Sequence, residues 1–416
     1  MEVKTGFRQT EVEFAPAKWT YRPLQTTGRW FSGTTPRMAN AAYWSGDIPW
    51  VSPKDMKVSR IGDSQDHISQ KAVADGAHVL PRGAILIVIR GMILAHSLPV
   101  ALTERPVAFN QDIKALVTCA DVDSRFLLYW LTANAHHLRS LTTESTHGTK
   151  RLPTEMLFRV LVACPPKAEQ EAIAEALGDA DALIESVERL IAKKRQLKQG
   201  AMQELLTGRR RLPGFSGEWE VKRWGNLILS CSSGATPYRG RPDFYKGEIK
   251  WITSGELNYK VIVDTLEHIS TEAMAKTNLR IHPTGTFLMA ITGLEAEGTR
   301  GACGFVGSPA TTNQSCMAIY PSSDLLPEYL YHYYVYRGDA LALEYCQGTK
   351  QQSYTARLIR ILPIDLPPTV AEQAAIAGAL SDMDAEIDEL NTRLAKARQL
   401  KQGMMQELLT GKIRLV

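Results

Sequence analysis

The chain has 416 residues, 44% of them hydrophobic, which is enough to bury two cores. Its 48 basic and 44 acidic residues give a formal net charge of +4, too close to balance to indicate a nucleic-acid partner by itself. The longest apolar run, residues 84–89, is far shorter than the ~20 residues of a membrane-spanning helix. No secretory leader is recognisable, so we expect a cytoplasmic protein. The six cysteines form no Cys-x-x-Cys pair, which predicts reduced, buried thiols rather than disulfides or a zinc site.

Residues 1–163 are predicted to form a mixed α/β domain. The apolar run at 84–89 has the composition of a strand, and residues 124–141 have that of a helical stretch. Glycine, proline, serine and asparagine separate such segments, as expected of turns in a globular domain.

A long helix is predicted next, over residues 164–208. It begins after Pro165 and Pro166, contains no further proline and ends at Gly208. Its apolar residues recur in alternating steps of four and three, the pattern of a helix that packs against another helix. About 40 residues correspond to about 60 Å of helix, too long to remain without a partner. The candidate helix-pairing residues are Ile173, Leu177, Ile184, Val187 and Ile191, with Ala180 in the same series.

The second half of the chain repeats this order. A basic linker at 209–218 leads to a second mixed α/β domain at 219–366 and then to a second long helix at 367–416. In this domain we expect strands at 287–291 and 304–306 and a helix at 328–343. The candidate helix-pairing residues of the second helix are Ile376, Leu380, Met383, Ile387, Leu390 and Leu394. Gly200 and Gly403, inside the two helical patterns, predict a kink or a close helix contact.

The repeat is nearly literal at the helix ends. Residues 195–208 return as 398–411 with one mismatch, Ala201 against Met404. The domains match more loosely, in a Ser-Gly-x-Thr-Pro segment at 32–36 and 233–237 and in short islands elsewhere. The chain is therefore a tandem repeat of one domain-and-helix unit. The two helices could pair in parallel or antiparallel, and an antiparallel pair would relate the domains by an approximate two-fold axis.

Two similar but divergent domains on rigid helices suit a ligand that presents two different short sites. Duplex DNA is such a ligand, and its own pseudo-two-fold symmetry matches the repeat. Basic and aromatic residues interleave in both domains, and arginine and lysine are the usual donors to phosphates and guanines. Trp50 and Trp251, at equivalent positions, are interpreted as core aromatics rather than DNA contacts. The candidate DNA-binding residues are Arg37, Tyr43, Lys54, Tyr238, Arg239, Arg241 and Lys246.

A Gly-Thr-Lys segment also recurs, at 148–150 and 348–350. Its backbone N–H groups and lysine could bind a phosphate, or the segment could be a structural turn that closes each domain onto its helix. The further candidate DNA-binding residues at these segments are Lys150, Arg151, Lys350, Gln351 and Gln352.

Signals for catalysis are weak. Asp243, Glu248 and Lys250 imitate the two carboxylates and lysine of magnesium-dependent nucleases, but the equivalent residues of the first domain, which include Ala42, do not repeat that set. We find no Asn/Asp-Pro-Pro-Tyr/Phe methyltransferase motif and no phosphate-binding loop. The chain is predicted to have no catalytic residue, no metal site and no cofactor of its own.

Taken together, these motifs resemble the specificity subunits of type I DNA restriction-modification systems. The residues that carry the resemblance are the Leu-Lys-Gln-Gly-x-Met-Gln-Glu-Leu-Leu-Thr-Gly helix ends, the Glu-Gln-x-x-Ile helix starts at 169–173 and 372–376, the linker at 212–219 and the Ser-Gly-x-Thr-Pro segments. The resemblance extends over essentially the whole chain.

The resemblance implies a mixed α/β fold with two target recognition domains separated by two long, antiparallel, coiled-coil-like helices in a pseudo-two-fold arrangement. Each domain would recognise one half of a bipartite, asymmetric site in double-stranded DNA, and the helices would set the spacer. Two methyltransferase subunits and restriction subunits would be the protein partners, and S-adenosylmethionine, ATP and magnesium would bind to those partners. The alternatives from the residues alone are a coiled-coil adaptor that binds only proteins and a nuclease or methyltransferase fragment.

Overall fold

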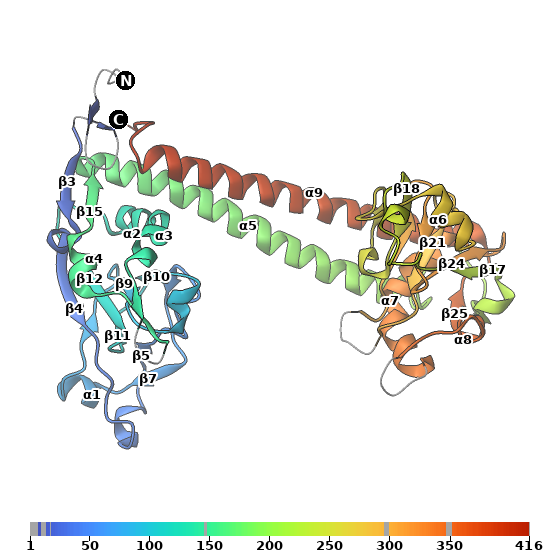
Figure 1. Cartoon of the computed structure of the whole chain (residues 1–416). Helices are drawn as coiled ribbons and strands as arrows, with labels where there is room; N and C mark the ends of the chain where they lie inside the picture. The colour runs from blue at the N-terminus through green and yellow to red at the C-terminus, as the bar shows by residue number, and fades with distance from the viewer. Residues whose placement is uncertain are drawn as a thin grey trace. The chain divides into compact units, whose positions relative to one another are not determined.

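The computed structural model describes residues 7–9, 14–16, 18–144, 148–294, 299–346 and 352–415. The chain divides into two compact units, and each combines segments from both halves of the sequence. The first unit comprises Met1–Glu188 and Arg393–Val416, and the second comprises Arg189–Thr392. Figure 1 colours the chain from blue to red, so that the red end of the sequence can be followed into the first unit.

The domain of the first unit is built on two sheets. The larger has the strand order β4-β12-β9-β10-β6, with one parallel pair, β10 with β6. The smaller has the order β7-β5-β11-β8. The strands are β1 (Phe7–Gln9), β2 (Phe14–Pro16), β3 (Thr20–Pro23), β4 (Gly28–Ser32), β5 (Ile48–Val51), β6 (Arg60–Ile61), β7 (Asp66–Ile68), β8 (Val79–Leu80), β9 (Ile85–Val88), β10 (Val100–Thr103), β11 (Val107–Phe109), β12 (Ile113–Thr118), β13 (Thr143–Glu144), β14 (Lys150–Arg151) and β15 (Leu161–Cys164).

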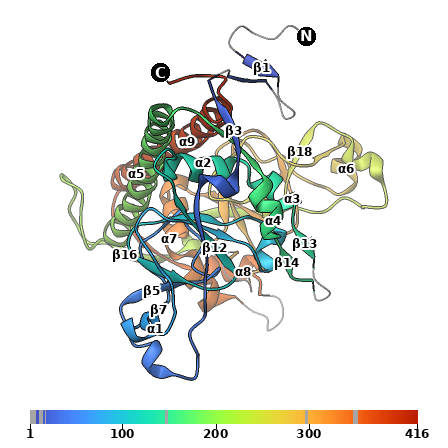
Figure 2. The same cartoon turned by 90° about the vertical axis from the view of Figure 1, so that its left-hand side faces the viewer.

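Short helices pack around these sheets. They are η1 (Leu24–Thr27), η2 (Ala41–Tyr43), α1 (Gln70–Ala74), η3 (Met92–Ala95), α2 (Ser124–Ala133), α3 (Ala135–Ser140) and α4 (Thr154–Arg159). The predicted strand at 84–89 is the central strand β9, which is buried on both faces, and the predicted helix at 124–141 is divided into α2 and α3 at Asn134. Figures 1 and 2 show that α1, β5 and β7 form a lobe of this unit that lies away from α5, and this lobe has a small core of its own around Trp50 and Ile68.

The domain of the second unit repeats this plan. Its larger sheet has the order β17-β24-β21-β22-β19 and its smaller sheet the order β20-β18-β23. The predicted strands and helix are confirmed as β21, β22 and α7. The elements are β16 (Glu220–Arg223), η4 (Trp224–Asn226), β17 (Ile228–Ser233), η5 (Pro242–Tyr245), β18 (Ile249–Ile252), η6 (Ser254–Glu256), β19 (Val261–Ile262), β20 (His268–Ile269), α6 (Thr271–Lys276), β21 (Phe287–Ala290), β22 (Cys303–Val306), β23 (Thr311–Thr312), β24 (Cys316–Pro321), α7 (Pro327–Tyr345), α8 (Ala356–Ile361) and β25 (Pro363–Leu366).

The two long helices are α5 (Lys167–Leu205) and α9 (Val370–Leu408), each of 39 residues. Ion pairs join them within each unit. In the first unit Asp181 pairs with Lys401 at 2.5 Å and Glu188 with Arg398 at 2.6 Å. In the second, Lys198 pairs with Asp384 at 2.5 Å, and Lys194 pairs with Glu386. Residue numbers fall along α9 as they rise along α5, so the pairing is antiparallel, as predicted.

Apolar residues near the start of each long helix pack into a domain core, and the remaining candidates are buried or half-buried along the helices. Near the helix starts, Ile173 and Leu177 join the core of the first unit, while Ile376 and Leu380 join the core of the second. Of the remaining candidates, Val187, Ile191 and Ile387 are buried, whereas Ile184, Met383, Leu390 and Leu394 are half-buried.

Each core is completed by a helix end from the other half of the sequence. Leu408 and Leu409 belong to the core of the first unit, and Met202, Leu205 and Leu206 belong to the core of the second. Gly208 and Gly411, just beyond the helices, have φ angles of 67° and 72°, the left-handed conformation that favours glycine where a helix stops. The prediction of a close helix contact at Gly200 and Gly403 is wrong, because a Cβ atom built at either would meet nothing within 4 Å.

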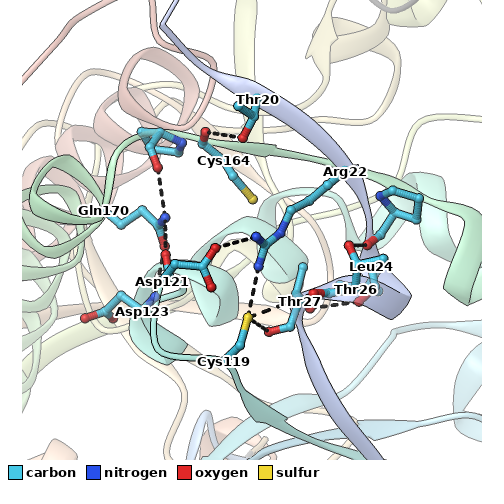
Figure 3. Close-up of polar contacts among 12 residues, drawn as sticks. Thr20, Arg22, Leu24, Thr26, Thr27, Cys119, Asp121, Asp123, Cys164 and Gln170 are labelled. Carbon is cyan, nitrogen blue, oxygen red and sulfur yellow. Dashed lines mark hydrogen bonds and ion pairs between the residues drawn. The ribbon is translucent and has the colours of Figure 1, made fainter.

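The start of α5 is fastened to its domain by Gln170 (Figure 3). Its Oε1 accepts a hydrogen bond from the backbone N–H of Asp123 at 2.9 Å, and its Nε2 donates to the carbonyl of Asp121 at 3.0 Å. Nearby Cys119 and the Arg22 guanidinium, which donates to the Asp121 carboxylate at 2.5 Å, lower the pKa of Asp121 to about 2. In the second unit Gln373 makes the equivalent contacts, with the N–H of Leu326 and the carbonyl of Asp324.

All six cysteines are free thiols, and burial raises the pKa of Cys119 and Cys164.

Candidate nucleic-acid interface

One surface is built in the same way in both domains. The Ser-Gly-x-Thr-Pro loop (32–36 and 233–237) lies against an Asn-Gln turn (110–111 and 313–314), and we call the two together the loop–turn surface. The N–H of Thr34 donates to the carbonyl of Phe109 at 3.0 Å, and the N–H of Ala235 donates to the carbonyl of Thr312 at 3.2 Å. The loop therefore adopts the same backbone contact in two domains whose sequences otherwise differ.

Glycine makes this close approach possible. A Cβ atom at Gly33 would lie 2.0 Å from the carbonyl oxygen of Asn110, and one at Gly234 would lie 1.8 Å from that of Thr312. Any larger residue would force the loop away from the turn. The glycine of the repeated segment is thus explained by packing of backbone on backbone.

A buried tryptophan supports the loop from beneath. The indole N–H of Trp50 donates to the carbonyl of Thr34, and that of Trp251 donates to the carbonyl of Ala235, both at 3.0 Å. The rings are 7% and 1% exposed. The structure therefore supports the core interpretation of both tryptophans, which hold the loop and cannot stack on a base from these positions.

The outer side of the surface carries a Thr–Gln pair in each domain. The hydroxyl of Thr35 donates to Oε1 of Gln111 at 2.5 Å, and Thr236 donates in the same way to Gln314. The turn beneath is shaped by asparagine, because the N–H of Asp112 donates to Oδ1 of Asn110 at 3.1 Å. Sequence reasoning missed this pair, although its signal was present: Asn110-Gln111 recurs as Asn313-Gln314, 203 residues later.

Beside the turn, the backbone frame is shared while the side chains differ. An isolated antiparallel bridge joins Arg90 to Arg151 in the first domain, and the equivalent bridge joins Thr292 to Ser353 in the second. The first domain therefore presents two guanidinium groups where the second presents two hydroxyls. The side-chain chemistry at these positions therefore differs between the domains while the backbone bridge is kept.

The candidates of the first domain lie on exposed or half-buried positions. Arg37 is exposed in the segment after the loop, and Lys54 is exposed and pairs with Asp66 at 2.7 Å. The hydroxyl of Tyr43 donates to Asp75 at 2.8 Å. Hydrogen bonding to Asp75 raises the pKa of that phenol. Tyr43 lies on η2 and Lys54 follows β5, so these three residues lie on the lobe of α1, β5 and β7 or next to it.

Lys150 and Arg151 lie on β14, in the hairpin with β13. Nζ of Lys150 bonds to Glu144 at 2.7 Å, and Gly148 has a φ of 77° at a bend in the backbone. The N–H of Gly91 donates to the carbonyl of Lys150 at 3.0 Å, which fastens the hairpin to the strand-end region of β9. Lys350 and Gln351 of the second segment lie outside the described residues, and Gln352 is half-buried.

In the second domain, two of the candidate arginines are engaged within the protein. Arg239 pairs with both oxygens of Glu267, at 2.5 and 2.8 Å, and lies over the ring of Tyr245. Its guanidinium lowers the pKa of Glu267. Arg241 bonds to both oxygens of Asp243, at 2.8 and 2.5 Å. Tyr238, 72% exposed, and Lys246 face solvent beside these pairs.

The nuclease-like pattern does not form a metal site. Asp243 is bound to Arg241, while Nζ of Lys250 donates to the carbonyl of Val263 and to Ser308. Among the residues that the structure describes, no three His, Cys, Asp or Glu side chains are grouped so as to hold a metal ion. None of the helices in the described residues combines the length and the hydrophobicity of a membrane-spanning segment.

Comparison with protein families identifies the family of the chain. The profile of the type I restriction modification DNA specificity domain matches residues 16–194 and again 216–399. The chain belongs to the family of type I restriction-modification specificity subunits. The chain is therefore a non-catalytic DNA-specificity subunit with two target recognition domains. The loop–turn surface recurs in both domains.

Two similar proteins are specificity subunits of type I restriction enzymes. The chain is 27% identical over 195 residues to the EcoR124I/EcoR124II specificity subunit of Escherichia coli, a match covering 46% of this chain and 48% of that protein. It is 26% identical over 303 residues to the MjaIX specificity subunit of Methanocaldococcus jannaschii, covering 67% of each. The chain is thus matched over about half the length of the first relative and about two thirds of the second.

Solved structures show the same fold. The S subunit of a type I restriction-modification system from M. genitalium superposes with a TM-score of 0.61 at 12% identity, over 98% of both chains. A chain from a structural study of type I complex assembly superposes with a TM-score of 0.56 at 14% identity, over 96% of this chain and 99% of that one.

Proposed function

We propose that each target recognition domain binds one half of a bipartite, asymmetric site in double-stranded DNA, and that α5 and α9 set the length of the unspecified spacer. The observation that carries this proposal is the loop–turn surface, which has one backbone frame in both domains but different side chains around it. A common frame suits docking on the common shape of a duplex, and the differing side chains suit two different base sequences.

Two methyltransferase subunits are the proposed partners, with restriction subunits added in the complete complex. The support lies in the near-identity of residues 195–208 and 398–411, since two identical partner subunits would require the same side chains at each of two docking positions. S-adenosylmethionine, ATP and magnesium would bind to those partner subunits, where the adenine N6 methylation and DNA cleavage would occur. Such a complex acts on DNA in the cytoplasm.

The test is selection of duplexes from a random library by the chain in complex with its methyltransferase subunits. We expect two short conserved sequences separated by a fixed number of unspecified base pairs. A chimaera in which residues 20–163 come from another specificity subunit should change one of the two sequences and leave the other. A chimaera that changed both, or a wild-type complex that selected no sequence, would refute the proposal in favour of a protein adaptor.

A further inference from the structure

The Thr–Gln pair on the loop–turn surface has a role that neither the fold nor the family assigns. We propose that the pairs Thr35–Gln111 and Thr236–Gln314 each bind a phosphate of the DNA backbone, as one sequence-independent contact per recognition domain. This inference rests on the proposed function, because it specifies how a domain that binds duplex DNA is held on it.

The chemistry of the pair favours an anionic oxygen as its ligand. In each domain the glutamine Oε1 accepts the threonine hydroxyl, so that oxygen is directed toward the loop. The Nε2 group keeps two N–H donors, and among the described residues none accepts a hydrogen bond from Nε2 of Gln111 or Gln314. Both glutamines are exposed. The pair therefore presents donors to solvent, and glutamine amides are among the groups that contact DNA phosphates.

The backbone beneath the exposed pair is held by several buried contacts. Each loop is held by a buried tryptophan and by a glycine that lets the loop backbone lie directly on the turn, as described above. Asn110 and Asn313 shape the turn by accepting the N–H of Asp112 and of Ser315, at 3.1 and 3.0 Å. A side chain held on such a base loses little conformational freedom when it binds a ligand.

The repetition of the pair decides what it contacts. The surroundings differ between the domains: Arg90 and Arg151 stand where Thr292 and Ser353 stand, and Lys114 on β12 is replaced by Met317 on β24. If the two domains recognise different base sequences, a group that is identical in both must contact what the two half-sites share. The phosphodiester backbone is that shared feature, whereas base edges are not.

A bidentate contact to adenine is the competing role for a glutamine. It would require Oε1 to accept from the adenine amino group while Nε2 donates to N7. The threonine hydroxyl already donates to Oε1 in both domains, so one of the two lone pairs of that oxygen is occupied and its orientation is set by the loop. The phosphate role uses only the donors that remain.

The substitution Gln111→Glu separates a phosphate contact from a structural tie. The carboxylate can still accept the Thr35 hydroxyl, so the loop stays joined to the turn, but the outward donors are replaced by negative charge. Gln111→Ala removes both the tie and the donors. Gln25→Ala is the matched control, because Gln25 is an exposed glutamine of the same unit that lies on η1.

The measurement is the affinity of the full chain, in complex with its methyltransferase subunits, for two duplexes: one selected by the wild-type complex and one of scrambled sequence. We expect Gln111→Ala to weaken binding to both duplexes by about tenfold, the effect of one hydrogen bond to a charged group, and Gln314→Ala to do the same. Because the two sites lie in separate domains, the double substitution should multiply the losses to about a hundredfold. Gln111→Glu should lose more than Gln111→Ala, and the control should bind like the wild type.

Two outcomes would overturn the inference. Wild-type affinity in Gln111→Glu would make the pair a structural tie only, and a changed preference at one base position would make the glutamine a base contact. Both outcomes leave sequence-selective binding by the wild-type complex intact. Failure of the proposed function would instead appear as loss of that selectivity in the wild type itself.

Discussion

Arg211 forms a two-point ion pair with Glu372, which lies 161 residues further along the chain. Its Nε and Nη2 atoms lie 2.5 and 2.6 Å from the two carboxylate oxygens, and Glu372 is 1% exposed. Arg414 and Glu169 repeat the pair in the first unit. In both units the segment that follows one long helix is thereby joined to the first turn of the other.

Arg211→Ala should destabilise the second unit by about 3 kcal/mol, because it leaves the buried Glu372 carboxylate without its partner. Arg210→Ala is the control, since the Arg210 pair with Glu204 is exposed and should contribute under about 1 kcal/mol. Urea unfolding, monitored by hydrogen exchange in α7 and α9, measures the loss of stability in both variants. Equal effects of the two substitutions would show that the buried pair does not stabilise the unit.

A chain of residues 1–212 should form a homodimer. Alone, it lacks Leu408 and Leu409, which complete the core of the first unit, but it carries their counterparts Leu205 and Leu206. A second copy can supply these residues. Sedimentation equilibrium should therefore give twice the monomer mass, and Leu205→Ser/Leu206→Ser should abolish the dimer. A folded monomer of residues 1–212 would contradict this expectation.

Removal of seven residues from the middle of both α5 and α9 should shorten the preferred DNA spacer. Seven residues keep the helical faces in register and remove about 10 Å, which is close to the rise of three base pairs of B-DNA. Library selection with the shortened chain reads out the new spacer. Removal of four residues from one helix alone is the comparison, because it disrupts the antiparallel ion pairs. An unchanged spacer in the seven-residue variant would argue against the helices as rulers.

Lys150→Ala should weaken DNA binding uniformly across sequences and reduce the slope of log affinity against log salt by about 0.9. Its pair with Glu144 is partly exposed and can be exchanged for a phosphate at little cost. The contrast is with Gln111→Ala, which removes no charge and should leave the salt slope unchanged. An effect of Lys150→Ala at a single base position would contradict the phosphate role.

The second unit should lose stability in mild acid because of His332. Burial, together with nearby Lys198, lowers the pKa of His332 to about 4, and its Nε2 lies 3.0 Å from the hydroxyl of Ser381. The unfolded chain takes up a proton near pH 6.5, before the folded chain does, so this stability is present above pH 6.5 and is lost as the pH falls toward 4. The loss should reach about 1–2 kcal/mol by pH 5.

Comparison of wild type with His332→Gln isolates this contribution from that of His282, whose pKa is also lowered by burial. Thermal unfolding at pH 7 and pH 5 should show a smaller pH effect in His332→Gln. His136→Gln, on the surface of α3, should behave like the wild type. The same pH effect in all three proteins would exclude His332 as its source.

The helices and the buried central strands were predictable because their signals are local. The heptad pattern of α5 and the apolar run of β9 depend on neighbouring residues alone. The loop–turn surface was not predicted, because Thr35 and Gln111 meet only once β4 and β12 have paired.

Charged candidates were harder to judge for the same reason. Arg239 is adjacent in sequence to aromatic and basic residues, as a DNA contact would be, but the fold gives it Glu267 as a partner. An exposed ion pair of this kind is weak, so Arg239 and Arg241 remain candidates for DNA contact. The sequence alone does not show which acidic residue pairs with each arginine, because that depends on how strands far apart in the chain pair with one another.

Because Leu408 and Leu409 belong to the core of the first unit, the order of synthesis affects when that unit can fold. The ribosome makes the first recognition domain well before it makes Leu408 and Leu409, which close the core of that domain. That domain therefore reaches its final stability only after α9 has been made. A chain that ends before α9 would have to find a second copy to close this core, and until then its first domain would be exposed to proteolysis.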